Sequence, residues 1–501
     1  MPEISPALTP AVDAYAAETL GLPTALLMGR AGEAVATEVM AYIAPPARIL
    51  VVCGGGNNGG DGYAAARRLA RCGYEALAVD ALGAGQRTPE GRAYLADYRS
   101  EVGEPLSLAE AEELVCDVLV DAVLGTGARL PLGEELAAVA DLMRRKEAYR
   151  IAVDLPLGVD AEGGCVDPRA VPADVTVALG FPKYGLYSYP ARAYVGRIAV
   201  ADIGLDTPPV RTHFDIRDHL LTEATVAPLL PQRDANSHKG SFGHLLLIAG
   251  SEAYRGAPLL AGAAALRMGA GLITLASPEA VLAGALVALP ELILAPLPAD
   301  APIPEGLTER KQAVLFGPGV GLSAATSERL TTLLTSKGCP LVLDADALTA
   351  LAAMGEEGKS LLKAEKRKVI LTPHPGEFAR LLGMTAEAVQ ADRLALARRF
   401  ASDYPVTLVL KGAATVVAEG SDFYLNTSGS PALAKGGSGD VLAGAIASLL
   451  ATGMTPLDAS RLAVWLHGAA GDRLAATCSS LGVRPAELPA AMAALLAEVA
   501  S

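Results

Sequence analysis

The sequence predicts an α/β protein with two domains, each built around a parallel β-sheet. Short apolar runs rich in Val, Ile and Leu alternate with Ala- and Leu-rich stretches of helical length through almost all of the 501 residues. This alternation is typical of parallel strands joined by crossover helices. At about 150 residues per domain, the length corresponds to two to four domains. The chain also contains 52 glycines, many of which directly follow the apolar runs.

The first half of the chain contains a helical segment and a series of predicted strands. Residues 12–43 have a helical composition that is broken at Gly21-Leu22-Pro23, and we expect this segment to cover the sheet. The predicted strands are residues 49–53, 76–79, 118–124, 151–153, 175–179 and 198–200.

A second series of strands begins near residue 245, and a helix-rich tail follows Gly439. Between the two series lie Pro208, Pro209 and the polar residues 231–240. Prolines among mixed charges are typical of a domain boundary, so we expect a junction at 210–225 and domains spanning residues 1–215 and 222–501. The second series of predicted strands is residues 245–248, 272–275, 314–316, 341–343, 369–371 and 407–410.

Charge and composition exclude several classes of protein. The chain has 41 Lys and Arg residues and 55 Asp and Glu residues, which gives a formal net charge of −14. We therefore expect neither nucleic acid nor a membrane surface as a partner. The most apolar stretch, residues 256–298, is interrupted by Arg267, Glu279 and Glu291, which argues against a membrane span. The first residues lack a secretion signal, and the 6 cysteines have irregular spacing. We therefore expect a soluble cytoplasmic protein with reduced core thiols.

The first predicted strand is followed by a segment of only Gly, Asn and Asp, from Gly54 to Gly62. Glycines let the main chain approach a ligand closely, and free N–H groups at a helix start attract anions. Two asparagines and Asp61 add oxygen atoms for a cation or for ribose hydroxyls. The segment predicts a phosphate or nucleotide site before a helix that starts at Tyr63. The alternative is a turn in which Asp61 only caps that helix.

Two further strands of the first domain end in polar residues. The run 118–124 contains Asp121 and leads into Gly125-Thr126-Gly127, and Asp154 follows the run 151–153. In open α/β sheets, ligands bind outside the carboxyl ends of the strands. Each aspartate alone could cap a loop, but three polar strand ends in one domain favour a site. Asp154 is the best acid–base candidate, because desolvation there would tune its pKa.

The second domain contains a different glycine-rich motif, Gly436-Gly-Ser-Gly-Asp440, before an apolar helix predicted for residues 441–450. The N–H groups of this motif would form an anion hole at the helix N-terminus. Asp440 would lie beside a bound phosphoryl group, where it could deprotonate an attacking hydroxyl. The motif GxxxxGK[ST] is absent, so this is not a P-loop. An ordinary N-capped helix is the alternative interpretation.

Other polar segments of the second domain also follow predicted strands. His374 lies between two prolines, where it could serve a site or make a structural hydrogen bond. Lys411 could face a phosphate or be a solvated lysine. The segments are Gly317-Pro-Gly-Val-Gly321, Asp344-Ala-Asp346, Thr372-Pro-His-Pro-Gly-Glu377 and Lys411-Gly-Ala-Ala-Thr415.

These motifs resemble those of a known family. NNGGDG, DAVLGTG and DLPLGVD, in this order, resemble the epimerase domain of NAD(P)H-hydrate repair enzymes. KGSFGHLLLIAGS, GPGVG, TPHPGE, LKGAAT and GGSGD resemble the ribokinase-like dehydratase domain of the same enzymes. The resemblance covers nearly the whole chain in the order of the fused bacterial form. It implies a Rossmann-like three-layer αβα domain followed by a ribokinase-like α/β domain.

The resemblance implies repair of NADH and NADPH whose nicotinamide ring has taken up water, the hydrates NADHX and NADPHX. In this family the first domain interconverts the R and S epimers, and the second dehydrates the S epimer. ADP drives the dehydration in the bacterial enzymes, with ATP as the alternative donor, by phosphorylation of the ring hydroxyl and release of AMP and phosphate. We expect Mg²⁺ with the nucleotide, small molecules as the partners, and a homo-oligomer.

In the first domain, the resemblance implies that Asn58 and Asp121 bind K⁺ and that Asp154 contacts the nicotinamide end and transfers a proton. The family usually has Ser or Thr where this chain has Leu157, so a K⁺ ligand at this position would be its main-chain carbonyl. The residues implied to hold the phosphates and ribose of the hydrate are Asn57, Asn58, Gly59, Gly60, Asp61, Gly125, Thr126, Gly127, Ala128, Arg129, Leu130 and Pro131.

In the second domain, the resemblance implies that Asp440 is the catalytic base and that Ala257, Gly319 and His374 line the hydrate site with it. The residues implied to bind the adenine nucleotide are Lys411, Gly412, Ala413, Ala414, Thr415 and Gly439.

Two other functions remain open from the sequence. An ATP-dependent kinase of a vitamin precursor would use the same ribokinase-like fold and the same GGSGD motif, although NNGGDG in the first domain argues against it. The first domain could also be a non-catalytic binding module, with Leu157 marking the loss of its activity.

Overall fold

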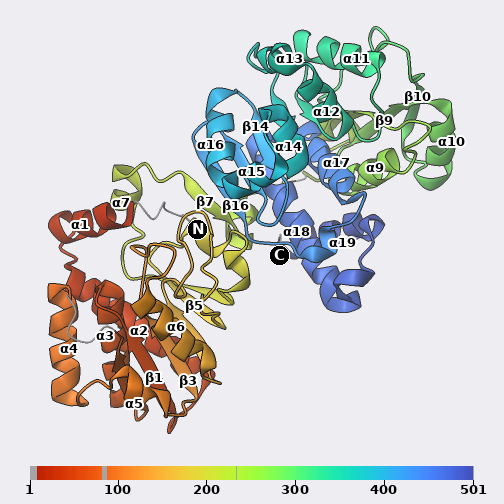
Figure 1. Ribbon diagram of the computed structural model, residues 1–501. Coiled ribbons are helices and arrows are strands. Elements are labelled where there is room, and N and C mark those ends of the chain that lie inside the picture. Colours follow the sequence, from red (N-terminus) through yellow and green to blue (C-terminus); the bar gives the residue numbers. More distant parts are fainter. Residues whose placement is uncertain (1–7, 82–86, 233, 500–501) are drawn as a thin grey trace. The chain divides into compact units, whose positions relative to one another are not determined.

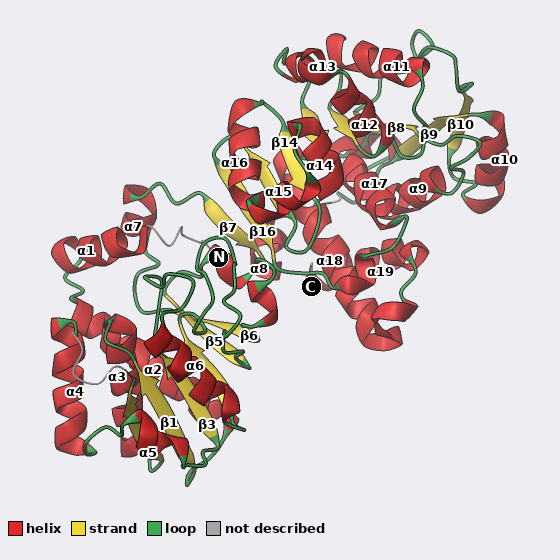
Figure 2. Ribbon diagram, viewed as in Figure 1, coloured by secondary structure: helices red, strands yellow, loops and turns green. Residues whose placement is uncertain are grey.

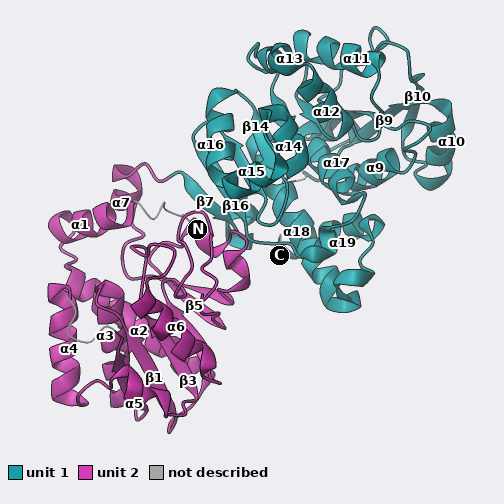
Figure 3. Ribbon diagram, in the orientation of Figure 1, with its two compact units in different colours: residues 1, 217–501 teal, residues 2–216 magenta. Residues whose placement is uncertain are grey.

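The computed structural model describes residues 8–81, 87–232 and 234–499. The chain divides into two compact units, residues 2–216 and residues 217–501, which are coloured separately in Figure 3. We call them the first unit and the second unit. Each contains one sheet with helices packed on it (Figures 1 and 2), so the predicted α/β fold class is confirmed.

The first unit is built on a six-stranded sheet. Its strands are β1 (Arg48–Cys53), β2 (Glu75–Asp80), β3 (Val118–Ala122), β4 (Tyr149–Val153), β5 (Val175–Leu179) and β6 (Arg197–Ala201). Its helices are α1 (Thr9–Thr19), α2 (Thr24–Tyr42), α3 (Asn57–Arg71), α4 (Pro89–Glu101), α5 (Leu108–Glu112), α6 (Glu134–Arg145) and α7 (Pro208–His213). All neighbouring strands are parallel, in the order β2-β1-β3-β4-β5-β6. The direction of strand addition reverses between β1 and β3, and such a switch point is where open α/β sheets bind ligands.

Helices cover both faces of this sheet because successive side chains of a strand point to opposite faces. Ile49 and Val51 of β1 share a buried cluster with α2, α3 and α4. Leu50 and Val52 share another cluster with α5 and α6. Strands buried on both faces have continuous apolar sequences, which is why they could be predicted from the sequence.

The second unit is built on a ten-stranded sheet in the order β10-β9-β8-β11-β12-β13-β14-β15-β16-β7. Its strands are β7 (Asp218–Leu221), β8 (His244–Ile248), β9 (Leu272–Ser277), β10 (Ile293–Pro296), β11 (Ala313–Phe316), β12 (Leu341–Leu343), β13 (Val369–Leu371), β14 (Thr407–Leu410), β15 (Val416–Glu419) and β16 (Asp422–Asn426). Its helices are α8 (Glu223–Val226), α9 (Ala257–Arg267), α10 (Glu279–Ala288), α11 (Ala324–Thr335), α12 (Asp346–Ala353), α13 (Gly355–Leu362), α14 (Pro375–Leu382), α15 (Ala386–Ala391), α16 (Arg393–Asp403), α17 (Ser438–Ala451), α18 (Pro456–Gly482) and α19 (Leu488–Val499). The switch point lies between β8 and β11, which are parallel neighbours.

One face of the second sheet carries α9, α17, α18 and α19. Leu245 and Leu247 of β8 share a buried cluster with residues of these helices. Leu246, between them, is also fully buried, so the other face is covered as well. Helix α17 is almost entirely buried and packs tightly on α9.

The structure adds four strands that the sequence analysis missed: β7, β10, β15 and β16. Strand β15 is antiparallel to both of its neighbours, β14 and β16, so the second sheet is not purely parallel. The missed strands are at most five residues long, and β16 begins with Asp422 and ends with Asn426, both polar. Such short, partly polar runs resemble loops in a sequence.

Two predicted helix starts are wrong in the same direction. Helix α3 begins at Asn57 instead of Tyr63, so Asp61 lies inside the helix and does not cap it. Helix α17 begins at Ser438 instead of Val441. Glycine costs a helix about 1 kcal/mol per residue relative to alanine, so glycine-rich sequences predict loops. At α3, Gly59 packs on the main chain of Gly54, and at the start of α17, Gly437 has φ of 96° and lies against the side chain of Leu260, so both positions require glycine.

Two smaller expectations concern membranes and cysteines. Within the described residues, no helix is long and apolar enough to cross a membrane. All six cysteines are free, but Cys165 and Cys478 are exposed, so the expectation that all are core thiols is wrong.

Candidate active sites

The glycine-rich segment after β1 forms the first turns of α3 at the switch point of the first sheet. The side-chain amide of Asn58 donates a hydrogen bond to the carbonyl of Leu124, which follows β3, at 2.9 Å. A Cβ on Gly59 would lie 1.9 Å from the carbonyl oxygen of Gly54, so only glycine lets the helix start this close to the strand end. The N-cap residue Gly56 has no side chain, so the first N–H groups of α3 remain available to an anion.

Asp154 follows β4 and has a left-handed backbone conformation, with φ of 66°. Its Oδ1 accepts hydrogen bonds from Lys183 Nζ at 2.5 Å and from the main-chain N–H of Leu179 at 3.1 Å. A Cβ on Gly125 would lie 3.6 Å from Asp154 Oδ2 and 3.8 Å from Asn58 Cβ. The structure therefore brings Asp154, Gly125 and Asn58 together from three strand ends, as expected for one site.

Lys183 is a site residue that the sequence analysis missed. It is 2% exposed, and its ammonium group also donates to the carbonyl of Leu179 at 3.1 Å. It lies in the sequence Phe181-Pro182-Lys183, shortly after the carboxyl end of β5. The position after a strand end was the available signal, because this edge of the sheet already held Asp121 and Asp154.

Two further carboxylates lie in the electrostatic surroundings of Asp154 and Lys183. Burial raises the pKa of Asp61 well above its usual range, and the charges of Asp154 and Asp13 raise it further. Burial also raises the pKa of Asp13, which α1 contributes and which the sequence analysis missed. Carboxylates that share one buried ammonium favour a state in which one of them is protonated. The cluster is therefore suited to hold and release a proton.

Asp121 is a buried carboxylate at the end of β3. It accepts hydrogen bonds from the main-chain N–H groups of Leu157 at 2.7 Å and Val123 at 3.2 Å. Burial raises the pKa of Asp121 to about 6, although these two hydrogen bonds act to lower it. Among the described residues, no cationic side chain pairs with it. The site fits a monovalent cation, which would supply the missing positive charge.

Leu157 itself belongs to the core. Its side chain is fully buried in the cluster beneath α5 and α6. Its carbonyl oxygen accepts a hydrogen bond from the N–H of Val171 at 2.9 Å. One lone pair of this oxygen remains, so a main-chain ligand role for Leu157 stays a prediction.

The rest of the predicted phosphate and ribose segment, residues 126–131, continues from Gly125 as a loop that is partly exposed. The N–H of Ala128 donates to the carbonyl of Gly125 at 3.0 Å, which turns the loop back toward the strand end. This is the placement that a ligand-binding loop at the switch point needs.

In the second unit, α17 starts with free hydrogen-bond donors. The N–H groups of Gly439 and Asp440 make no hydrogen bond to any residue that the structure describes. The N-cap residue Gly437 has φ of 96° and no side chain to cap the helix. A Cβ on Gly439 would lie 3.3 Å from Lys411 Nζ, so an ammonium group lies at the same helix start. Two free donors, a helix dipole and a cation together form an anion site.

Lys411 is held by groups from two other strand ends. Its Nζ donates to Asp344 Oδ1 at 2.7 Å, and the hydroxyl of Thr372 donates to the same oxygen at 2.8 Å. Burial lowers the pKa of Lys411, but the charges of Asp344 and Glu377 outweigh burial and leave it raised. Lys411 therefore stays a cation at the anion site, which favours the phosphate interpretation over a solvated lysine.

Asp440 lies within the first turn of α17. Burial and the charge of Asp344 raise its pKa to about 7, although Lys411 acts to lower it. A carboxylate with a pKa near neutrality is well matched to general-base catalysis.

Of the two roles predicted for His374, the structure confirms the structural hydrogen bonds. Its Nδ1 accepts from the N–H of Gly376 at 3.0 Å and of Glu377 at 3.4 Å, and so caps α14. Burial, then the charge of Lys411, lower its pKa, so the ring is neutral. The ring remains about half exposed and can also face a ligand.

Ala257 and Gly319 meet at the switch point between β8 and β11. A Cβ on Gly319 would lie 3.2 Å from Ala257 Cβ, and Gly319 has φ of 64°. The N–H of Gly250, after β8, donates to the carbonyl of Pro318 at 2.8 Å and ties the two loops together.

Arg393, which the sequence analysis missed, holds the segment 411–415 from the start of α16. Its guanidinium donates to the carbonyl oxygens of Leu410, at 2.7 Å, and Ala413. Burial lowers the pKa of Arg393 to about 10. The hydroxyl of Thr415 closes the turn by donating to the carbonyl of Gly412 at 3.0 Å.

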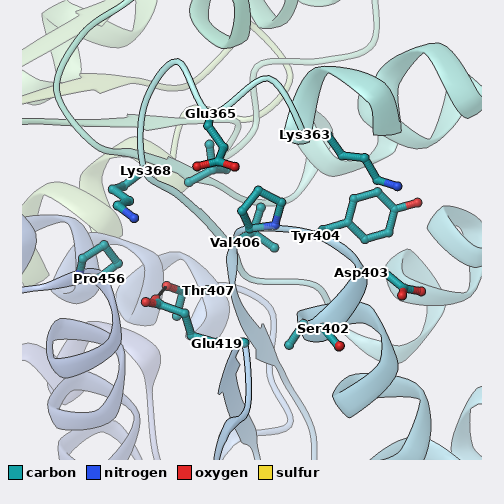
Figure 4. A pocket seen from close by; sticks show the side chains of 14 residues that line it. Lys363, Glu365, Lys368, Ser402, Asp403, Tyr404, Val406, Thr407, Glu419 and Pro456 are labelled. Carbon is teal, nitrogen blue, oxygen red and sulfur yellow. Dashed lines mark hydrogen bonds between the residues drawn. The ribbon is translucent and has the colours of Figure 1, made fainter.

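A cavity of about 500 Å³ in the second unit lies apart from these residues (Figure 4). It includes Val369 and Thr407, the first residues of β13 and β14, whereas His374 and Lys411 follow the carboxyl ends of the same strands. One of its charged groups, the Nζ of Lys363, lies 4.9 Å from the centre of the Tyr404 ring. We therefore do not assign this cavity to the active site.

Comparison with known proteins identifies the family. Residues 24–185 match the family described as YjeF-related protein N-terminus, and residues 245–493 match NAD(P)H-hydrate dehydratase. The bifunctional NAD(P)H-hydrate repair enzyme Nnr of Moorella thermoacetica is 38% identical over 489 residues, which cover 93% of this chain and 91% of that protein. The chain belongs to the family of bifunctional NAD(P)H-hydrate repair enzymes. The predicted resemblance is thereby confirmed.

Two further relatives agree with the family of bifunctional NAD(P)H-hydrate repair enzymes. The Nnr protein of Thermofilum pendens is 36% identical, with 92% of this chain and 90% of that protein covered. The ADP/ATP-dependent NAD(P)H-hydrate dehydratase of Bacillus subtilis, co-crystallised with ATP and Mg²⁺, is 35% identical with a TM-score of 0.50. This match covers 56% of this chain and 98% of the Bacillus subtilis chain, and together with a solved structure described as ribokinase-like it confirms the ribokinase-like fold of the second unit.

Proposed function

We propose that the first unit interconverts the R and S epimers of NADHX and NADPHX, and that the second unit dehydrates the S epimer with ADP. The observation that carries the second activity is the position of Asp440 beside the free N–H groups at the start of α17 and beside Lys411. The family membership over almost the whole chain supports both activities.

In the proposed dehydration, Asp440 takes the proton from the ring hydroxyl, and the oxygen attacks the β-phosphorus of ADP. The bond to AMP then breaks. The N–H groups of Gly439 and Asp440 and the ammonium of Lys411 stabilise the charge on the transferred group. The original bond between the ring carbon and this oxygen breaks next, so that phosphate leaves with the bonding electrons, and the neighbouring ring carbon loses a proton, which the phosphate accepts. The products are NAD(P)H, AMP and phosphate.

The remaining assignments in the second unit follow the same proposal. Ala257, Gly319 and His374 line the hydrate site. Mg²⁺ would neutralise phosphoryl oxygens of the nucleotide, and the Bacillus subtilis relative was co-crystallised with ATP and Mg²⁺. ADP is the proposed donor, with ATP as the alternative. The proposed nucleotide-binding residues are Lys411, Gly412, Ala413, Ala414, Thr415 and Gly439.

In the proposed epimerisation, the hydroxyl leaves the ring carbon as water after it receives a proton, and water returns to the opposite face and gives a proton back. Asp154 donates and recovers this proton, with Lys183 holding its carboxylate. K⁺ at Asn58 and Asp121 would supply positive charge beside the anionic hydrate. Residues 57–61 and 125–131 would hold its phosphates and ribose.

Incubation of the purified chain with the S epimer of NADHX and ADP tests the proposal. The dihydronicotinamide absorbance in the near ultraviolet should return, with one AMP and one phosphate per molecule repaired. A folded protein that restores no absorbance but phosphorylates a vitamin-precursor alcohol with ATP would instead be the alternative kinase. The expectations of a homo-oligomer and of a cytoplasmic location stay predictions.

A further inference from the structure

His467 of α18 contacts the first residue of α17. It is 7% exposed, and its Nε2 lies 3.0 Å from the main-chain oxygen of Ser438 and 3.1 Å from Ser438 Oγ. A carbonyl oxygen can only accept a hydrogen bond, so Nε2 carries the proton and Nδ1 does not.

The imidazole ring of His467 is neutral. Burial lowers its pKa to about 4, the hydrogen bond to Ser438 acts in the opposite direction, and the charge of Lys411 lowers it further. His467 therefore supplies a hydrogen-bond donor without adding a second cation beside Lys411.

The hydrogen bond from His467 fixes a peptide group that the anion site uses. The carbonyl of Ser438 and the N–H of Gly439 belong to the same planar peptide group, and in a trans peptide they point in opposite directions. Holding the carbonyl therefore holds the direction of the N–H. This N–H is one of the two free donors at the start of α17.

We propose that His467 is a positioning residue for dehydration: it holds the peptide between Ser438 and Gly439 so that the N–H of Gly439 faces the transferred phosphoryl group. This inference rests on the proposed function of the second unit. The role is indirect, because the ring contacts the main chain behind the donor and acts on the reaction only through it.

A matched pair of amide variants tests the proposal in the full-length chain. In His467→Gln the amide nitrogen reaches the position of Nε2, whereas in His467→Asn it is too short to do so. Ser460→Ala is the control, because Ser460 is a buried residue of the same helix whose hydroxyl donates to the carbonyl of Pro456 at 2.7 Å. We measure kcat and KM with the S epimer and ADP, and the epimerisation rate as an internal control.

His467→Asn should lower kcat for dehydration by about 100-fold, the usual cost of losing one donor to developing charge. KM for the hydrate and the epimerisation rate should stay unchanged. His467→Gln should recover to within about 10-fold of the native kcat, and Ser460→Ala should retain it. If the native chain is active and the Asn and Gln variants have equal kcat, this inference is overturned while the proposed function stands. An inactive native chain would overturn the proposed function and this inference with it.

Discussion

Asp440 illustrates how neighbouring groups decide what a single carboxyl can do. An exposed aspartate is ionised at all physiological pH values and is a weak base. Burial and the charge of Asp344 move the pKa of Asp440 to about 7, so it is basic enough to take a proton from a hydroxyl. The same side chain without these surroundings would have little catalytic value.

The shift has a direct consequence for the pH dependence of dehydration. Because the carboxylate is the active form, kcat/KM should be constant above pH 7 and should fall about tenfold per unit below it. The S epimer, ADP and a pH series measured at constant ionic strength give this profile. A rate that stays constant down to pH about 5, as a base with the ordinary aspartate pKa of about 3.9 would give, would contradict the assignment of Asp440 as the base.

In the first unit, Lys183 is the neighbouring group that holds the proposed acid–base residue, Asp154. Replacing Lys183 with Met removes the buried positive charge that holds the carboxylate, so epimerisation should fall by about 100-fold or more. Dehydration of the pure S epimer should not change. Chromatographic separation of the two epimers over time measures the rate.

Lys146→Met is the matched control for Lys183→Met. Lys146 belongs to the same unit and donates to the main-chain carbonyls of Ala111, Glu112 and Leu114, with no part in the site. The Lys146→Met variant should epimerise at a rate close to that of the native chain. Equal loss in both variants would mean that Lys183 only stabilises the fold.

The position of a residue relative to a strand end largely determined whether the sequence analysis found it. Asp121, Asp154 and the first residues of α3 follow strands, and the shared carboxyl edge of a parallel sheet predicts their proximity. Asp13 and His467 come from helices far away in sequence, so only the packing of those helices brings them to the sites. Their roles could not be predicted from motif spacing.

At the scale of secondary-structure elements, the two site helices share one feature: each begins with glycines that have little space for a side chain. Gly59 of α3 lies against the main chain of Gly54, whereas Gly437, the N-cap residue of α17, lies against the side chain of Leu260. Local propensity therefore disfavours these helix starts, and tertiary packing overrides it. This is why both helix starts were placed too late. The gain is a helix N-terminus with free N–H groups and no side chain over them.

The packing of α17 on α9 in the second unit requires glycine at position 444 of α17. A Cβ at this position would lie 2.2 Å from the carbonyl oxygen of Ala261 in α9, and main chain cannot move aside easily. Gly444→Ala should destabilise the second unit by about 1–3 kcal/mol, which lowers its melting temperature by several degrees. Calorimetry of the full chain should show this shift in one transition.

Gly284→Ala in α10 is the control for Gly444→Ala. No atom lies within 4 Å of its added Cβ, so alanine should leave the melting temperature unchanged or slightly raise it. If Gly444→Ala melts at the native temperature, the close contact between α9 and α17 is not as the structure has it.

At the scale of the whole molecule, the net charge of −14 and the proposed anionic ligands are compatible. In both units the groups available to phosphates are main-chain N–H donors at helix starts, with few cations. A basic surface would attract polyanions, whereas such glycine-lined sites bind small anions without one. The net charge therefore argues against nucleic acid as a ligand, but it does not argue against nucleotides.

The central claim is that two separate sites in one chain act in sequence, and the pure R epimer tests it most directly. With ADP, the native chain should restore the near-ultraviolet absorbance completely. Asp154→Asn should stall on the R epimer and recover when a free epimerase is added, whereas Asp440→Asn should interconvert the epimers and restore no absorbance. A native chain that stalls on the R epimer, or a loss of both activities in either variant, would contradict the account.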